Sequence, residues 1–104
     1  MQDKGGFVYI MTSRRNGTLY TGVTSNLEQR FAKHKIKYYK TSFTAKHNVH
    51  ILVYYEHFPT IESAIKREKQ IKDWNRNWKK DLIEKSNPNW RNLADDLFST
   101  GTVI

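Results

Sequence analysis

The sequence contains no cysteine, and this absence excludes both a disulfide framework and a metal site built from thiolates. It also lacks any apolar run that approaches the length of a transmembrane helix. The first residues, MQDKGG, contain no apolar segment of the kind found in a secretory leader. These absences predict a protein that works in the cytoplasm and does not enter a membrane.

Acidic residues are scarce relative to basic ones, because 10 Asp and Glu stand against 18 Lys and Arg, which gives a net charge of +8. A chain with this balance and a pI near 9.8 is expected to bind a polyanion. No long basic amphipathic helix with a clean apolar face is visible, so nucleic acid is favoured over a membrane surface. The 104 residues show no repeat or linker, which predicts a single domain over 1–104, with flexible ends at 1–6 and 99–104.

Two strand-like runs near the N-terminus predict a β-hairpin. They are Phe7–Met11 and Thr18–Val23, and the pair Asn16-Gly17 between them is a strong turn signal. Two turns fit the sequence: Asn16 and Gly17 alone, or a longer loop that begins at Arg14.

The two turns give Tyr9 different partners across the hairpin. The shorter turn places Tyr9 opposite Thr24, and the longer loop places it opposite Gly22. In both registers Tyr9, Tyr20 and Gly22 lie on one face, while ordinary core residues fill the other face. The first face therefore carries two phenols beside a glycine gap, which is unusual for a half-buried hairpin.

A helix is expected directly after the hairpin, because Ser25 and Glu28 match the first and last positions of a capping box. Arg30 and His34 are four residues apart, so both project from one side of this helix. Its inward stripe consists of two apolar residues, Leu27 and Phe31. The connection is short, and we expect Arg30 and His34 to lie near the hairpin tyrosines around one shallow site.

The second half of the chain alternates between strand and helix signals. The run Val49–Phe58 is almost continuously apolar and predicts a central strand packed on both faces. Thr60 is expected to cap a helix over 61–74, which is followed by a helix over 78–84. Asn87 is expected to cap a last short helix. This order predicts an α+β fold, in which helices pack on a small, mainly antiparallel three-stranded sheet.

Glu68 falls on the inward stripe of the helix predicted over 61–74, where the periodicity calls for an apolar residue. A buried carboxylate needs a cation, because an unpaired buried charge is very unfavourable. The cation is either Arg30 or a nearby lysine in a salt bridge, or a divalent metal ion. A single carboxylate suits a hard ion such as Mg²⁺, which keeps several waters and binds substrate phosphate at the same time.

The segment from Lys35 to Asn48 is polar, basic and interleaved with aromatic residues. Such a composition suits contact with phosphates and unstacked bases. The predicted nucleic-acid-binding residues are its lysines, Lys35, Lys37, Lys40 and Lys46.

Phe7-Val8-Tyr9, followed by Tyr20-Thr21-Gly22, Arg30 and the later Glu68, resembles the GIY-YIG nuclease family. The resemblance covers roughly Gly6 to Trp90 and is nearest to small single-domain bacterial members. These are also similar to the nuclease domain of the excision-repair incision subunit. The chain departs from the pattern at Phe7, Thr21 and Val23, which stand where relatives carry glycine, isoleucine and, in some, lysine. The late asparagine of the family matches Asn75, Asn77 or Asn87.

The resemblance implies a divalent-metal-dependent endonuclease that hydrolyses DNA phosphodiester bonds, in DNA repair or processing. It makes Tyr9 the general base, Tyr20 the residue that positions phosphate or water, and Glu68 the ligand of Mg²⁺ or Mn²⁺. The guanidinium of Arg30 matches a phosphate, and the imidazole of His34 is suited to relay a proton. Two alternatives are a nucleic-acid-binding module with little cleavage, on DNA or RNA, and an interaction domain whose charge is incidental.

Overall fold

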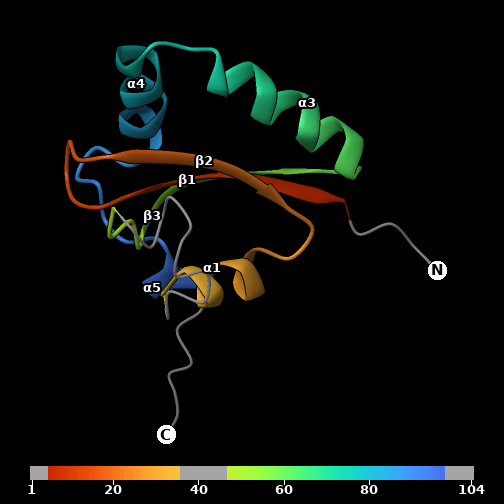
Figure 1. Cartoon of the computed structure of the whole chain (residues 1–104), viewed down its shortest axis with the longest axis horizontal. Helices are drawn as coiled ribbons and strands as arrows, with labels where there is room; N and C mark the ends of the chain where they lie inside the picture. Colours follow the sequence, from red (N-terminus) through yellow and green to blue (C-terminus); the bar gives the residue numbers. More distant parts are fainter. Residues whose placement is uncertain (1–4, 36–46, 98–104) are drawn as a thin grey trace, which may run out of the picture.

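The computed structural model describes residues 5–35 and 47–97, with the side chains of 33–35 left out (Figure 1). Three predicted nucleic-acid contacts, Lys37, Lys40 and Lys46, therefore lie outside the described residues, as do most of the two ends that were expected to be flexible. At the N-terminal end, Gly6 is buried and already belongs to the first strand, so the lead-in is shorter than predicted.

The fold is α+β, as the sequence predicts. Its three antiparallel strands are β1 (Gly6–Thr12), β2 (Leu19–Thr24) and β3 (Ile51–Phe58), in the spatial order β2-β1-β3. The expectation that the run Val49–Phe58 forms the central strand is wrong, because β1 is central and β3 lies at an edge. Burial explains the error: β1 is buried almost throughout, whereas the second half of β3 alternates between exposed and half-buried residues. An apolar run does not reveal how many neighbours a strand has.

The hairpin adopts the longer of the two predicted loops. Tyr9 lies opposite Gly22 and Met11 opposite Tyr20. The amide of Gly17 donates to the carbonyl of Arg14 at 2.8 Å, and Asn16 has a left-handed backbone (φ 58°) that asparagine tolerates well. The loop chemistry therefore fixes which residues meet across the hairpin.

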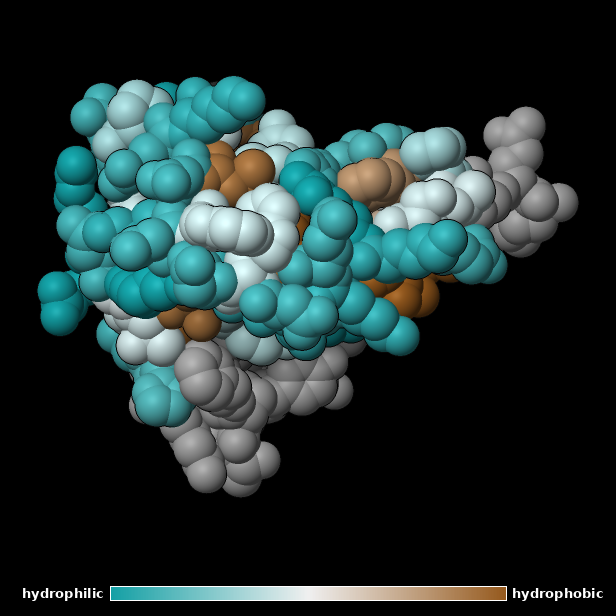
Figure 2. All heavy atoms as spheres, turned by 90° about the horizontal axis from the view of Figure 1, so that it is seen from above, coloured by the Kyte–Doolittle hydropathy of each residue, from teal (hydrophilic) through white to brown (hydrophobic). Residues whose placement is uncertain are grey.

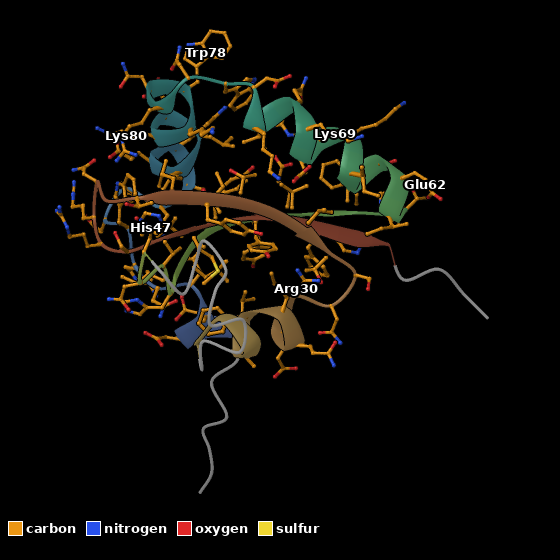
Figure 3. All side chains as sticks on the ribbon, in the orientation of Figure 1. Arg30, His47, Glu62, Lys69, Trp78 and Lys80 are labelled. Atoms are coloured by element: carbon orange, nitrogen blue, oxygen red, sulfur yellow. The ribbon has the colours of Figure 1, made fainter. Side chains whose placement is uncertain are left out.

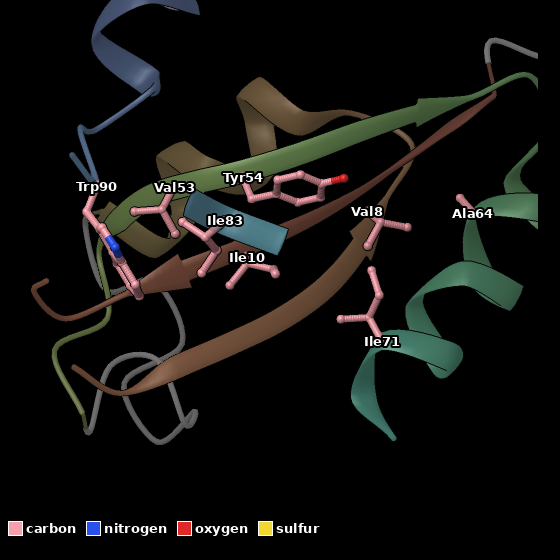
Figure 4. Close-up of a cluster of buried hydrophobic side chains, with 8 residues drawn as sticks. All are labelled: Val8, Ile10, Val53, Tyr54, Ala64, Ile71, Ile83 and Trp90. Atoms are coloured by element: carbon pink, nitrogen blue, oxygen red, sulfur yellow. The ribbon is translucent and has the colours of Figure 1, made fainter. Parts of the chain in front are cut away.

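Helices cover both faces of the sheet (Figure 1). On one face lie α3 (Ile61–Lys72) and α4 (Arg76–Ser86), and on the other lie α1 (Leu27–Lys35) and α5 (Ala94–Leu97). Each face has its own cluster of buried side chains. The first, shown in Figure 4, consists of Val8, Ile10, Val53, Tyr54, Ala64, Ile71, Ile83 and Trp90. The second consists of Tyr9, Met11, Leu27, Phe31, Val49, Leu52 and Ala94.

Asparagines cap the N-terminal ends of two helices, α1 and α4. At α1 the side chain of Asn26 accepts from the amide of Gln29 at 3.0 Å, so the cap lies one residue beyond Ser25. Asn75 caps α4, which begins earlier than predicted. Thr60 caps α3 as expected. A capping side chain accepts an amide hydrogen that has no partner within its own helix, and asparagine and threonine both supply the oxygen.

Asn87 does not cap a following helix. It ends α4 and is only 4% exposed, with its amide nitrogen donating to the carbonyls of Val53 and Arg91. Its side-chain oxygen accepts from the amide of Arg91 at 3.0 Å. This asparagine ties β3 to the C-terminal segment, and the last helix begins only at Ala94.

Candidate functional site

Tyr9 of β1, Tyr20 of β2 and Arg30 of α1 meet on the face of the sheet that α1 covers. The two tyrosine rings are tilted by 45°, with their centroids 6.2 Å apart. Arg30 is half-buried and hydrogen-bonds the Tyr9 hydroxyl, which also interacts with Tyr20. The pairing of β1 with β2 brings the phenols together, and the short connection to α1 places the guanidinium beside them. The structure thus joins three of the predicted site residues.

Gly22 makes room for this arrangement. A Cβ atom at Gly22 would lie 2.5 Å from both Cζ and the hydroxyl oxygen of Tyr9, and 3.0 Å from Cε2 of Tyr20. Ordinary carbon contacts are about 3.5–4.0 Å. The glycine gap seen in the sequence is therefore the space that Tyr9 fills.

Burial controls the protonation of Tyr9, whose side chain is only 1% exposed. Desolvation raises the pKa of this phenol well above its usual range, and the neighbouring Tyr20 raises it further, while Arg30 acts in the opposite direction. Because burial outweighs the guanidinium, Tyr9 keeps its proton in the free protein. The base role that the resemblance implies for Tyr9 therefore requires further positive charge at the site.

Glu68 projects from α3, on the opposite side of the sheet from Arg30, and is 7% exposed. Its carboxylate lies 2.5 Å from the ammonium group of Lys72, one turn further along the helix. The expectation that a buried carboxylate needs a cation is met by Lys72, whose side chain is 51% exposed. The sequence left two candidates for the salt-bridge partner of Glu68, Arg30 and a nearby lysine, and the structure has the lysine in this role.

A hollow at the outer edge of β2 connects the two groups of residues. It has a volume of about 300 Å³ and is lined by Leu19, Tyr20, Thr21, Lys72 and Lys79. Tyr20 belongs to both sides of the site, because its ring packs against that of Tyr9 and it lines this hollow together with Lys72. Sequence reasoning missed Lys79; only the packing of α4 beside β2 brings this residue to the site.

The donor set limits what ion this site can hold. Over residues 5–35 and 47–97, no group of three or more His, Asp or Glu side chains is arranged as a metal site. Glu68 alone fits a hard, largely hydrated divalent ion that gains further ligands from a substrate phosphate. Such an ion has to displace the ammonium group of Lys72 from the carboxylate.

Two other predicted site residues are only partly placed. His34 and Lys35 belong to α1, but the positions of their side chains fall outside the described residues. The expectation that His34 lies near the hairpin tyrosines and relays a proton remains a prediction. The same holds for the late asparagine of the family: Asn75 and Asn87 have structural roles at the ends of α4, and Asn77 is exposed.

Comparison with known proteins agrees with this geometry. The model of the GIY-YIG catalytic domain matches residues 5–81, which is more than half of the chain, and the protein belongs to this family of nucleases. The family name refers to the two tripeptides that carry Tyr9 and Tyr20.

The relatives are small bacterial proteins. A UPF0213 protein of Staphylococcus haemolyticus is 39% identical over 82 residues, which cover 75% of this chain and 93% of the relative. A UPF0213 protein of Syntrophus aciditrophicus is 38% identical over 82 residues, covering 79% and 92%. The solution NMR structure of a UPF0213 protein from Bacillus halodurans has the same fold, with a TM-score of 0.53, 24% identity, and coverage of 95% of this chain and 99% of that one.

The names of these relatives state no activity. The family points to nucleic acid as the substrate class. In the part of the chain that the structure describes, no helix has the length and apolar character needed to cross a bilayer.

Proposed function

We propose that this protein is a divalent-metal-dependent endonuclease that hydrolyses phosphodiester bonds of DNA, in the cytoplasm and in DNA repair or processing. The observation that carries the proposal is the cluster of Tyr9, Tyr20 and Arg30 around the gap at Gly22, in a chain that belongs to a nuclease family. A packing role alone does not require an arginine against a buried phenol.

The reaction needs a water oxygen to bond to phosphorus while one ester bond to a sugar oxygen breaks. A base removes a proton from the water, and the departing sugar oxygen gains a proton. A bound Mg²⁺ or Mn²⁺ ion at Glu68 supplies positive charge for the phosphate oxygens and the departing oxygen. The side chains of this protein must bind the phosphate and carry the protons.

Tyr20 is the phenol best placed to contact the phosphate, because it is half-buried and lines the hollow at the edge of β2. Arg30 supplies a guanidinium group that fits phosphate oxygens. Tyr9 holds Arg30 and Tyr20 in position and becomes a base only when additional positive charge at the site lowers its pKa. His34 remains our candidate for proton relay beside Tyr9.

Nicking of supercoiled plasmid with Mg²⁺ or Mn²⁺ present tests this proposal. We expect Glu68→Gln and Tyr20→Phe to abolish nicking while the melting temperature stays within a few degrees of the wild type. Glu68→Gln keeps the shape of the side chain, and its partner Lys72 is half-exposed, so little stability depends on the pair. The matched control is Glu62→Gln, an exposed acid of the same helix (Figure 3).

Equal nicking by Glu68→Gln and the wild type would contradict the metal role. No nicking by the wild type on duplex, flap, branched or single-stranded DNA would leave the second candidate, a nucleic-acid-binding module. Two observations favour that alternative: Lys72 already neutralises Glu68, and burial keeps the pKa of Tyr9 high.

A further inference from the structure

Two adjoining hollows follow the outer edge of strand β2. The first, about 300 Å³, is lined by Leu19, Tyr20, Thr21, Lys72 and Lys79. The second, about 320 Å³, is lined by Thr18, Leu19, Arg76 and Lys79. Because they share Leu19 and Lys79, they form one strip that begins at Tyr20 and ends at the hairpin loop. We call this strip the β2-edge track.

Three cations line the track, and each is held differently. Arg76 donates to the carbonyls of Asn16 and Gly17, at 2.7 Å each, which fixes the start of α4 to the hairpin loop. Lys72 is paired with Glu68 at one end. Lys79 lines both hollows, is half-buried, and forms no ion pair with another described residue.

Basic residues continue beyond the track. Arg14 and Arg15 are exposed in the hairpin loop that Arg76 contacts. The face seen from above the sheet is mainly hydrophilic, with a few small apolar patches (Figure 2). Among the described residues no acid lines either hollow, and Lys72 neutralises its own partner Glu68.

Helix stability does not explain the two cations of α4, Arg76 and Lys79. Acidic residues are favoured in the first turn of a helix, because the helix dipole is positive there. The first turn of α4 contains Arg76 and Lys79 but no acid. The cations therefore repel the helix end and one another, and a bound anion would relieve both repulsions.

We infer that the β2-edge track binds the sugar–phosphate backbone of a nucleic-acid strand and leads it to Tyr20. This inference rests on the proposed function, because it takes Tyr20 as the contact with the phosphate that is cut. Lys79 and Lys72 contact phosphates on one side of that position, while Leu19 and Tyr20 offer apolar surface to sugars and bases. None of the three cations of the track belongs to the basic segment from Lys35 to Asn48 that the sequence indicated.

Salt-dependent binding without metal tests the track. A short fluorescein-labelled DNA duplex, and one of its strands alone, are titrated with protein in EDTA at several salt concentrations, and affinity is read from fluorescence anisotropy. A phosphate contact contributes about 0.9 to the slope of log affinity against log salt for a duplex, and about 0.7 for a single strand. We expect Lys79→Gln to lower the slope by about one such increment, and Lys72→Gln/Lys79→Gln by about two.

Lys69→Gln is the matched control, since Lys69 is an exposed lysine of α3 that lines neither hollow (Figure 3). The salt dependence of binding by Lys69→Gln should have the same slope as that of the wild type. The melting temperatures of all variants should lie within a few degrees of the wild-type value. Equal slopes for Lys79→Gln and Lys69→Gln would overturn the track, as would an absence of salt-dependent binding by the wild type. The nicking assay separates the two proposals: a reduced slope in a protein that never nicks supports the track and overturns the nuclease.

Discussion

The space at Gly22 gives the sharpest test of the site. In Gly22→Ala the new methyl group meets Cζ and the hydroxyl of Tyr9 at 2.5 Å, about 1 Å inside an ordinary contact. Tyr9 has nowhere to move, because it is 1% exposed and belongs to the buried cluster between the sheet and helices α1 and α5. Overpacking of a filled core typically costs about 1–3 kcal/mol.

The backbone itself would accept alanine. Gly22 does not have a left-handed φ, unlike Gly5 at +80°. Replacing glycine by alanine at a compatible position normally stabilises a protein by about 0.4–1 kcal/mol through the unfolded chain. We expect the clash to outweigh this gain and leave a net loss of roughly 1–2 kcal/mol. For a domain of this size that loss lowers the melting temperature by roughly 4–16 °C.

Urea and thermal denaturation followed by circular dichroism measure the effect, and a double-mutant cycle assigns it to Tyr9. Tyr9→Leu removes the two atoms that lie 2.5 Å from the new methyl group. In that background Gly22→Ala should be neutral or stabilising, although Tyr9→Leu itself destabilises the protein. Equal losses from Gly22→Ala in both backgrounds would refute the packing argument.

Two further predictions concern charge. Above pH 10, the usual pKa of tyrosine, the unfolded chain releases protons that the folded chain retains, since burial raises the pKa of Tyr9. The free energy of unfolding should therefore fall by about 1.4 kcal/mol per pH unit because of this tyrosine. Urea denaturation of the wild type and of Tyr9→Phe, repeated from neutral to alkaline pH, should give plots of unfolding free energy against pH whose slopes differ by this amount. Parallel plots would contradict the prediction. Lys72→Gln should bind Mn²⁺ about 1.4- to 5-fold more tightly, because a half-exposed ion pair contributes roughly 0.2–1 kcal/mol. Electron paramagnetic resonance of free Mn²⁺ measures this, and the gain should vanish in Lys72→Gln/Glu68→Gln.

The hairpin and the helix of Glu68 were predictable because their signals are local. Asn16-Gly17 indicates a turn, and side-chain periodicity places Tyr9 and Tyr20 on one face whichever loop forms. Periodicity also placed Glu68 on the buried side of α3, where the structure has it. Choosing between the two registers required the loop geometry, which the sequence left open.

Features that depend on tertiary packing were not predictable from the sequence. The central position of β1 is decided by pairing on both of its edges, and the apolar run of β3 carries no information about this. The sequence Asn87-Pro88 is typical of a helix start, whereas the side chain of Asn87 contacts Val53 and Arg91, in separate segments. Lys79 is an ordinary surface lysine until α4 docks beside β2.

The sheet divides the candidate site into two independently supported parts. The phenols and Arg30 depend on the layer built by α1, whereas the carboxylate depends on the layer built by α3. Drift in the interior of one layer therefore damages one part and spares the other. The β2-edge track belongs to the same layer as the acid, because Lys72 lies on α3 and Arg76 and Lys79 lie on α4. Damage to that layer would therefore weaken strand binding and displace Glu68 together, while the phenols and Arg30 stay in place.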